Sequence, residues 1–373
     1  MTSSGIGVGL DDSAQLRRLP DRLRQILDER GVADEEIVQA LSTGQLHFLA
    51  VDALLGPPGQ RFTLDELAAQ SGIDAIKIRV LWRALGFADV SPQERHFSEL
   101  DVDAAQIIRG LLGGGTEFDV AIQLARVIGS SMARIAEAEV VTSALGAVGP
   151  NVESDDLIEV ADHFSRFAAS TAPAVPQLLG YVWLRHLHAI STRYLLARDR
   201  GVFEASELEL AVGFLDLVGF TVLSQQLTTI ELSKIVSRFE ALAYDSVARL
   251  GGRVVKMIGD EVMFVADTAA AAAEICLTLK EAYGTEETLS EVRAGIAYGK
   301  VLTRDGDYYG NVVNLASRIV NIAKPGSLLI SDTLHEALIQ VQSYAMKPLR
   351  VRFLKDFGNV HLWVLRRSEE SLA

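Results

Sequence analysis

The sequence predicts an α+β protein with two domains, an all-helical N-terminal domain and a C-terminal domain that mixes strands with helices. Three observations support this prediction. Residues 11–198 carry apolar side chains at helical spacing. From about Glu207, short apolar runs typical of strands alternate with helical segments. The charged stretch that begins at Arg198 separates the two patterns, so we place the boundary between residues 200 and 207, with domains 1–200 and 201–373.

Composition limits the classes of function. With 373 residues, of which 49% are hydrophobic, the chain is long enough to build two cores. Its formal net charge of −14 argues against a nucleic-acid binder, since phosphate binding requires an excess of Lys and Arg. The single cysteine, Cys276, excludes a disulfide framework and favours a reducing cytoplasm, where we expect the protein to be located.

Neither a signal peptide nor a transmembrane segment is expected. Residues 1–10 are rich in Gly and Ser, lack a basic stretch followed by an apolar one, and are expected to be loose. The most apolar candidate for a span is 172–184. It is interrupted by Pro173 and Pro176 and is shorter than the roughly 20 apolar residues that a bilayer requires.

The N-terminal helices follow from apolar periodicity and from breakers. Leucine and isoleucine recur at helical spacing from Ser13 to Gly31, where glycine predicts the end of the helix. The sequence Pro57-Pro58-Gly59 breaks the chain after the early helices. The same reasoning predicts further helices over 34–41, 46–55, 100–112, 117–145, 155–169 and 176–196.

Residues 62–86 have the pattern of a helix-turn-helix. Thr63 and Glu66 form a capping box, and Gly72 is suited to the turn. One interpretation is DNA binding through the second helix. That helix begins near Asp74, whose carboxylate would face phosphates, and a recognition helix reads bases from its first residues. The pattern therefore favours a helical scaffold without a role in DNA binding.

The C-terminal domain is expected to follow the order β-α-β-β-α-β, which is a ferredoxin-like core, with additions at its end. Gly251-Gly252 predicts the end of the first helix, and Gly259-Asp260 the turn of the hairpin. The expected elements are a strand 209–216, a helix 230–250, a hairpin of 253–258 and 261–266, a helix 268–283, a strand 292–298, a helix 310–323, a strand 327–331, a short helix from 332 and a closing hairpin around 357–358.

Three blocks in this domain carry polar residues at positions suited to chemistry. An apolar run ends at Asp216, and a buried carboxylate is costly unless it is paired, for which a divalent cation is suitable. The alternative for Asp216 is a cap on the next helix. A second apolar strand precedes Asp260, and a third block runs from Asp307 through Asn314 to Arg318.

In order and spacing, these blocks resemble the class III nucleotidyl cyclases, the adenylyl and guanylyl cyclases, over roughly residues 205–367. The resemblance implies a lyase that forms cyclic AMP and pyrophosphate from ATP by attack of the ribose 3′-hydroxyl on the α-phosphate, and so a role in signal transduction. It also implies two divalent metal ions per site, Mg²⁺ or Mn²⁺, held by Asp216 and Asp260.

The resemblance assigns roles to four further residues. Lys256, at an even spacing of four from Asp260 on a strand, and Asp307 would contact adenine. A carboxylate accepts from the 6-amino group of adenine and repels the 6-oxo group of guanine, so this pair favours ATP over GTP. Asp305 is a competing candidate for the Asp307 role. Asn314 would orient the ribose, and Arg318, on the same helical face, would stabilise the phosphate in the transition state.

In the family the site forms between two catalytic domains, so the resemblance implies a homodimer with two equivalent sites. The helical half is similar to the regulatory domain of mycobacterial pH-sensing adenylyl cyclases. Our hypothesis is that it dimerises and switches the catalytic pair, with a proton acting on His186 and His188, or a lipid at 172–184, as the effector.

Three alternatives stay open at this point. The chain could be a guanylyl cyclase, or a cyclase-like binding or signalling module with little activity. Ile258-Gly-Asp-Glu-Val-Met-Phe264 also resembles the GGDEF signature of diguanylate cyclases, but Lys256 and the Asn314/Arg318 helix do not belong to that family.

Overall fold

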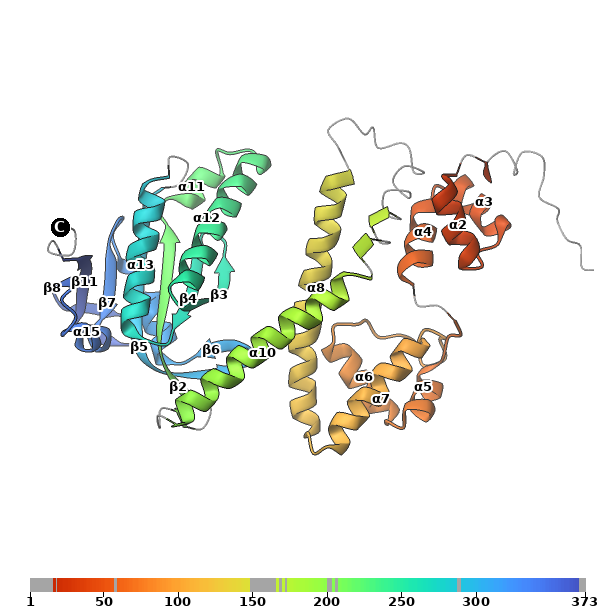
Figure 1. Ribbon diagram of the computed structural model, residues 1–373, viewed down its shortest axis with the longest axis horizontal. Coiled ribbons are helices and arrows are strands. Elements are labelled where there is room, and N and C mark those ends of the chain that lie inside the picture. Colours follow the sequence, from red (N-terminus) through yellow and green to blue (C-terminus); the bar gives the residue numbers. More distant parts are fainter. Residues whose placement is uncertain are drawn as a thin grey trace, which may run out of the picture. The chain divides into compact units, whose positions relative to one another are not determined.

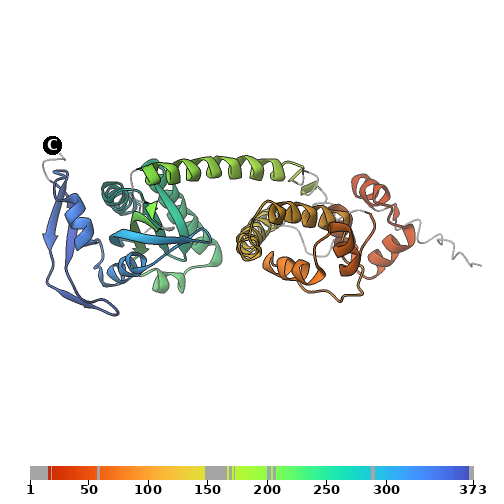
Figure 2. The same ribbon diagram turned by 90° about the horizontal axis from the view of Figure 1, so that it is seen from below.

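The computed structural model describes residues 16–17, 19–56, 59–147, 166–167, 170–171, 173–199, 203–204, 207–286 and 290–368. The chain divides into two compact units, Met1–His188 and Ala189–Ala373, each described separately below (Figure 1). The division falls within one helix, α10 (Val175–Asp199), which is continuous along its length (Figure 2). The expected loose residues 1–10 and most of the expected helix 155–169 lie outside the described residues.

In the first unit, α2 (Asp21–Glu29), α3 (Asp34–Ser42) and α4 (Leu46–Leu55) pack around a small apolar core. Of the helix expected from Ser13 to Gly31, residues 13–15 and 18 lie outside the described residues, and α2 begins after Pro20, whose ring disfavours helical geometry in the residue before it. Gly31, with φ of +72°, follows the end of α2 as expected.

The helix-turn-helix shape over 62–86 is confirmed. The first helix, α5 (Leu64–Ser71), begins with the expected capping box between Thr63 and Glu66, and Gly72 adopts the left-handed conformation after it. The second helix, α6 (Ala75–Ala84), is capped by the Asp74 side chain. Of its basic residues, Arg83 is ion-paired with Asp89, which lowers the charge available to a phosphate.

Two long helices complete the described part of this unit. After α7 (Glu99–Gly113) comes α8 (Phe118–Ala147), and their apolar residues pack with those of α5 and α6 in a second core. In the described part of the chain, each helix is too short or too polar to span a bilayer.

The second unit has the expected β-α-β-β-α-β order, which confirms the ferredoxin-like core (Figure 1). Its elements are β1 (Phe203–Glu204), β2 (Glu207–Leu217), α11 (Phe220–Ser224), α12 (Thr229–Arg249), β3 (Gly252–Ile258), β4 (Glu261–Ala266), α13 (Ala269–Gly284), β5 (Val292–Arg304), β6 (Asp307–Tyr309), α14 (Asn311–Ile322), β7 (Leu328–Ser331), α15 (Asp332–Leu338), β8 (Tyr344–Pro348), β9 (Arg352–Leu354), β10 (Gly358–Val360) and β11 (Leu362–Arg367).

The main sheet has the order β3-β4-β2-β5-β7-β11-β8, with β1 paired to β2 and β6 to β5. β5 and β7 are parallel, and the other pairs are antiparallel. β2 lies between β4 and β5, so the carboxylate at its end is flanked by a strand on each side.

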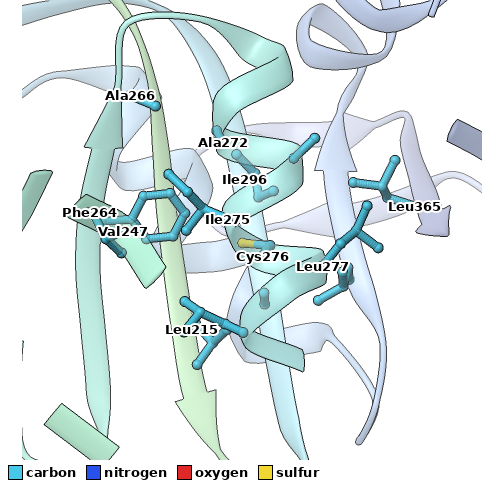
Figure 3. Close-up of a cluster of buried hydrophobic side chains, with 14 of the residues drawn as sticks. Leu215, Val247, Phe264, Ala266, Ala272, Ile275, Cys276, Leu277, Ile296 and Leu365 are labelled. Carbon is cyan, nitrogen blue, oxygen red and sulfur yellow. The ribbon is translucent and has the colours of Figure 1, made fainter. Parts of the chain in front are cut away.

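Both faces of β2 are covered, which explains its unbroken apolar sequence. Alternate residues such as Leu215 belong to a core with α12 and α13. The intervening residues, such as Val212 and Phe214, pack in the core beneath α14. Figure 3 shows the first core, where Ile275 and Cys276 of α13 lie among Leu215, Phe264 and Ile296 of the sheet.

At Gly295 of β5, α14 approaches the sheet without an intervening side chain. A Cβ at this position would collide with the backbone nitrogen of Val320 and crowd the Ala316 carbonyl. Glycine therefore allows the helix that carries Asn314 and Arg318 to sit directly on the strand.

The end of the domain is richer in strands than expected. The hairpin expected around 357–358 is present as β9 and β10, which form a separate two-stranded sheet. β6, β8 and β11 were not expected: β6 is only three residues long, and β8 and β11 join the main sheet.

Candidate active site

Asp216, the second-last residue of β2, is the site carboxylate with the least solvent exposure, at 8%. Its neighbours across the sheet are Arg293 on β5 and Glu261 on β4. The Arg293 Nε and Nη2 atoms lie 2.7 and 2.5 Å from Asp216 Oδ2, so the guanidinium satisfies the buried carboxylate. The capping alternative for Asp216 is wrong, because the N-cap of α11 is Gly219, which has no side-chain cap.

Asp260 lies in the turn between β3 and β4, where Gly259 adopts φ of +65°. The backbone N–H of Leu217 donates to the Asp260 carbonyl at 3.1 Å, which ties this turn to the end of β2. Burial raises the pKa of the Asp260 carboxyl, and the nearby Asp216 charge raises it further. The structure therefore brings the two expected metal-binding aspartates together.

Glu261 is a third carboxyl at this place, and the sequence analysis did not single it out. Burial raises its pKa to about 7, and the charges of Asp216 and Asp260 add to the effect. Its position directly after Asp260 on an apolar strand was the available signal, since an acidic residue in such a strand requires a partner.

These residues line a cavity of about 310 Å³. Its full lining is Asp216, Leu217, Gly219, Phe220, Ile258, Asp260, Glu261, Arg293 and Asn321. Three carboxyl groups face one guanidinium here, so burial first, and then the excess of negative charge, raises the pKa values of Asp260 and Glu261. A divalent cation with a preference for oxygen ligands fits this donor set.

Asp216 and Asp260 are the residues that would hold such a cation. Among the described residues there is no group of three or more His, Cys, Asp or Glu side chains arranged as a metal site. The remaining ligands would therefore have to come from backbone oxygens, water or substrate.

Lys256 and Asp307 form an ion pair, with Lys256 Nζ 2.6 Å from Asp307 Oδ2. Asp307 Oδ1 also accepts from the backbone N–H of Tyr308 at 2.8 Å, which fixes the carboxylate at the start of β6. The competing Asp305 instead faces Arg304, at 3.5 Å. The structure thus brings together the two residues expected to contact adenine.

The spacing argument that placed Lys256 and Asp260 on the same strand face is wrong. β3 ends at Ile258, before Asp260, and its pairing with β4 shifts between Val254 and Lys256. Such an irregularity breaks the alternation on which the argument depended. Lys256 is also absent from the lining of the acidic cavity.

Asn314 and Arg318 lie four residues apart on α14 and do not line the acidic cavity of their own chain. Asn314 is exposed, and Arg318 is half-buried with its Nη2 3.5 Å from Asp356 Oδ2. The residue of α14 that reaches the cavity is Asn321. It lies seven residues after Asn314, about 10 Å further along the helix. Of the six expected site residues, one chain therefore brings together two pairs, Asp216 with Asp260 and Lys256 with Asp307.

Known proteins resemble this chain in both of its parts. The family described as the adenylate and guanylate cyclase catalytic domain matches residues 204–367, and the family described as the adenylate cyclase regulatory domain matches residues 2–189. An adenylate cyclase of Streptomyces coelicolor is 34% identical over 348 residues, which cover 86% of this chain and 90% of that protein.

Two further relatives are more distant. A pH-sensitive adenylate cyclase of Mycobacterium tuberculosis is 29% identical over 355 residues, covering 93% of this chain and 87% of that protein. The crystal structure of the adenylyl cyclase CyaB from P. aeruginosa is 25% identical, with a TM-score of 0.40 and coverage of 46% of this chain and 100% of that one.

Proposed function

The chain belongs to the class III adenylyl cyclases, with an N-terminal adenylate cyclase regulatory domain, and from this premise we propose that it converts ATP into 3′,5′-cyclic AMP and pyrophosphate. The name adenylate cyclase, carried by relatives that span most of the chain, supports ATP as the substrate. The buried Cys276, which is free, supports a cytoplasmic location.

The observation that carries the proposal is the acidic cavity at the end of β2. Asp216 and Asp260 come from elements 44 residues apart, yet both line it together with Arg293. We propose that these two aspartates bind divalent metal ions, Mg²⁺ or Mn²⁺. When bound, two such ions about 4 Å apart lower the pKa of an attacking hydroxyl and neutralise charge on a leaving phosphate.

Other groups of the protein hold the two aspartates of the acidic cavity in position. Arg293 holds Asp216 in position, because its guanidinium offers two N–H groups to one carboxylate oxygen. The tie between Leu217 and Asp260 fixes the second carboxylate relative to the first. The aspartates therefore need little rearrangement on binding, which favours productive positioning of the phosphates.

Lys256 and Asp307 are proposed to select adenine. Their ion pair sets the orientation of both side chains, and the second oxygen of Asp307 is held by the Tyr308 N–H. A carboxylate here accepts from the adenine 6-amino group and is repelled by the guanine 6-oxo group.

Asn314 and Arg318 are proposed to act on a nucleotide held by a second copy of the chain. They project from α14 outside their own acidic cavity, so a single chain does not bring this pair to its own aspartates. In a homodimer each chain would supply the aspartates of one site and the Asn/Arg pair of the other, giving two equivalent sites. A monomer would be inactive.

The helical domain, residues 1–200, is proposed to regulate this dimer through α10. His186 and His188 lie on α10 with exposed side chains, and protonation between pH 5 and 8 would change the charge of this helix. A lipid is the other candidate effector. The exposed apolar residues of α10 include Leu178, Tyr181, Trp183, Leu184 and Leu187, a surface that a second chain or an acyl chain could cover.

The deciding experiment is product formation from ATP and GTP in parallel, with Mg²⁺ and Mn²⁺, at pH 5 to 8. It compares the full chain, residues 201–373 and the Asp216→Ala variant. Cyclic AMP that disappears in Asp216→Ala supports the proposal, and the comparison of full chain with residues 201–373 gives the sign of regulation. Formation of cyclic GMP from GTP instead would indicate a guanylyl cyclase. If neither nucleotide gave a product, the alternative of a cyclase-like binding module would be favoured.

A further inference from the structure

The C-terminal end of α10 contacts the catalytic domain through Tyr194. From Ser191 to Asp199, the described side chains are exposed apart from Arg193 and Tyr194, which are half-buried. The Tyr194 ring packs against the core beneath α14, next to residues of β2 and β5. This short stretch therefore connects the helix that leaves the first unit to the body of the second.

The Tyr194 hydroxyl makes a specific polar contact at this anchor. It lies 3.0 Å from Thr303 Oγ1, a hydrogen bond in which either hydroxyl can donate. Thr303 is the second-last residue of β5, just before the turn that leads into β6. In that pairing Thr303 lies opposite Tyr308, and Arg304 lies opposite Asp307.

The contact is thus one residue pair away from Asp307. Tyr308 packs in the same core as Tyr194, and its backbone N–H donates to Asp307 Oδ1. After β6 the chain passes through Gly310 directly into α14, whose Val312 also packs in this core. A displacement of Tyr194 would therefore move the β5–β6 hairpin, and with it the carboxylate that pairs with Lys256.

We propose that Tyr194 is a positioning residue, and that its hydrogen bond with Thr303 transmits the position of α10 to Asp307. This inference rests on the proposed function for the role of Asp307 in selecting adenine. It assigns the linker helix an effect on nucleotide affinity and base selection, in addition to any effect on the approach of two chains. The hairpin is short, and β6 pairs with β5 outside the main strand order, so it can shift with little change in the rest of the sheet.

The test uses the full chain with Tyr194→Phe, Thr303→Val and the double variant. Tyr194→Phe removes the hydroxyl and keeps the packing of the ring. Tyr244→Phe is the matched control, since it makes the same change in the same domain, on α12, at a side chain that is 53% exposed. Two readouts are combined: hydrogen exchange of the amides of residues 301–309, and KM for ATP with the ATP-to-GTP ratio of kcat/KM.

Each single variant is expected to speed amide exchange in the hairpin and to raise KM for ATP about fivefold, the factor that one neutral hydrogen bond is worth. The ATP-to-GTP ratio should fall, kcat should change less than KM, and the double variant should be no worse than the singles. Tyr244→Phe should match the parent.

The inference is overturned if the single variants leave both the exchange of 301–309 and KM unchanged, or if their effects add in the double variant. Failure of the proposed function has a different signature. The parent would then form no cyclic AMP, while the exchange readout would still decide whether Tyr194 and Thr303 hold the hairpin.

Discussion

Lys256 Nζ lies 2.6 Å from Asp307 Oδ2, so the two side chains proposed to select adenine already form an ion pair within one chain. Lys256 comes from β3 and Asp307 from the first position of β6, 51 residues later. Each holds the other in place, and each would have to share its hydrogen-bonding capacity with the base. Under the proposed function, base selection would therefore be a property of the pair.

Replacement of one partner should alter both affinity and selectivity. Asp307→Asn removes the charge that pairs with Lys256 and that accepts from the 6-amino group. We expect kcat/KM for ATP to fall by about 10- to 100-fold, as for one or two charge-assisted hydrogen bonds, and the preference over GTP to shrink. Steady-state kinetics with both nucleotides measures this. Asp305→Asn, two residues earlier and paired with Arg304, is the control and should behave as the parent.

The Arg293–Asp216 pair should be important for stability. In Arg293→Met the Asp216 carboxylate keeps its burial but loses its cation, which should cost about 2–3 kcal/mol in the free energy of unfolding. Urea unfolding measures the loss. The double change Arg293→Met/Asp216→Asn removes the unpaired charge and should recover part of it. A double variant as unstable as the sum of the singles would show that the pair is not coupled.

Complementation tests whether the site is shared between chains. Asp216→Ala and Arg318→Ala should each be inactive alone, because each removes a group required at both sites of a homodimer. Mixed in equal amounts after subunit exchange, they should recover about a quarter of the parent activity, since half of the dimers are mixed and each has one complete site. Inactive mixtures that are dimeric by size-exclusion chromatography would contradict the shared site.

Acid stability should depend on Glu274. The Arg367 guanidinium donates to Glu274 at 2.7 and 3.0 Å and holds the pKa of that carboxyl below its usual range. Because the pKa of the Glu274 carboxyl is lower in the folded protein, this group stabilises the fold at pH values above its unfolded-state pKa of about 4.3. This stabilisation is lost as the pH falls through the folded-state pKa.

Glu274→Gln should therefore lose about 1 kcal/mol at pH 7, with some discount for the partial exposure of the pair, and its stability should fall less steeply below pH 5. Urea midpoints from pH 3 to 7 give both quantities. Arg367→Met should produce the same flattening. An acid slope in Glu274→Gln as steep as in the parent would show that this pair does not control it.

The histidine hypothesis has a direct test in the full chain. His186→Ala/His188→Ala should flatten the dependence of activity on pH between 5 and 8, because histidine is the side chain that ordinarily changes charge in this range and both side chains are exposed on α10. If the double variant keeps the full pH profile of the parent, the effector acts elsewhere.

The sequence predicted correctly those elements that are marked by residues close together in the chain. The apolar run ending at Asp216, the glycine turn before Asp260 and the capping box at Thr63 each depend on neighbouring residues, and the structure confirms all three elements. The ferredoxin-like order followed from the sequence of such elements.

The misses depend on contacts between distant residues or on very short elements. Arg293 pairs with Asp216 across 77 residues, so no local pattern marked it. β6, with three residues, is too short to show the alternation of apolar and polar residues that marks a strand. The irregularity of β3 at Val255 removes the alternation of faces on which the argument for Lys256 depended. Asn321 reaches the cavity only because α14 lies against β5.

The seating of α14 on Gly295 has a mechanical consequence. Helix and strand are in backbone contact, with no side chain between them that could adopt a second rotamer. The helix cannot rotate or slide here without breaking that contact. Asn314 and Arg318 on α14 therefore move together with the sheet that carries Asp216, as one rigid unit. An inactive state of the enzyme is therefore not expected to come from a movement of α14 relative to the sheet within one chain. If two copies of the chain share their sites as proposed, an inactive state would arise from a change of distance or angle between the two chains, or from a movement of the β5–β6 hairpin.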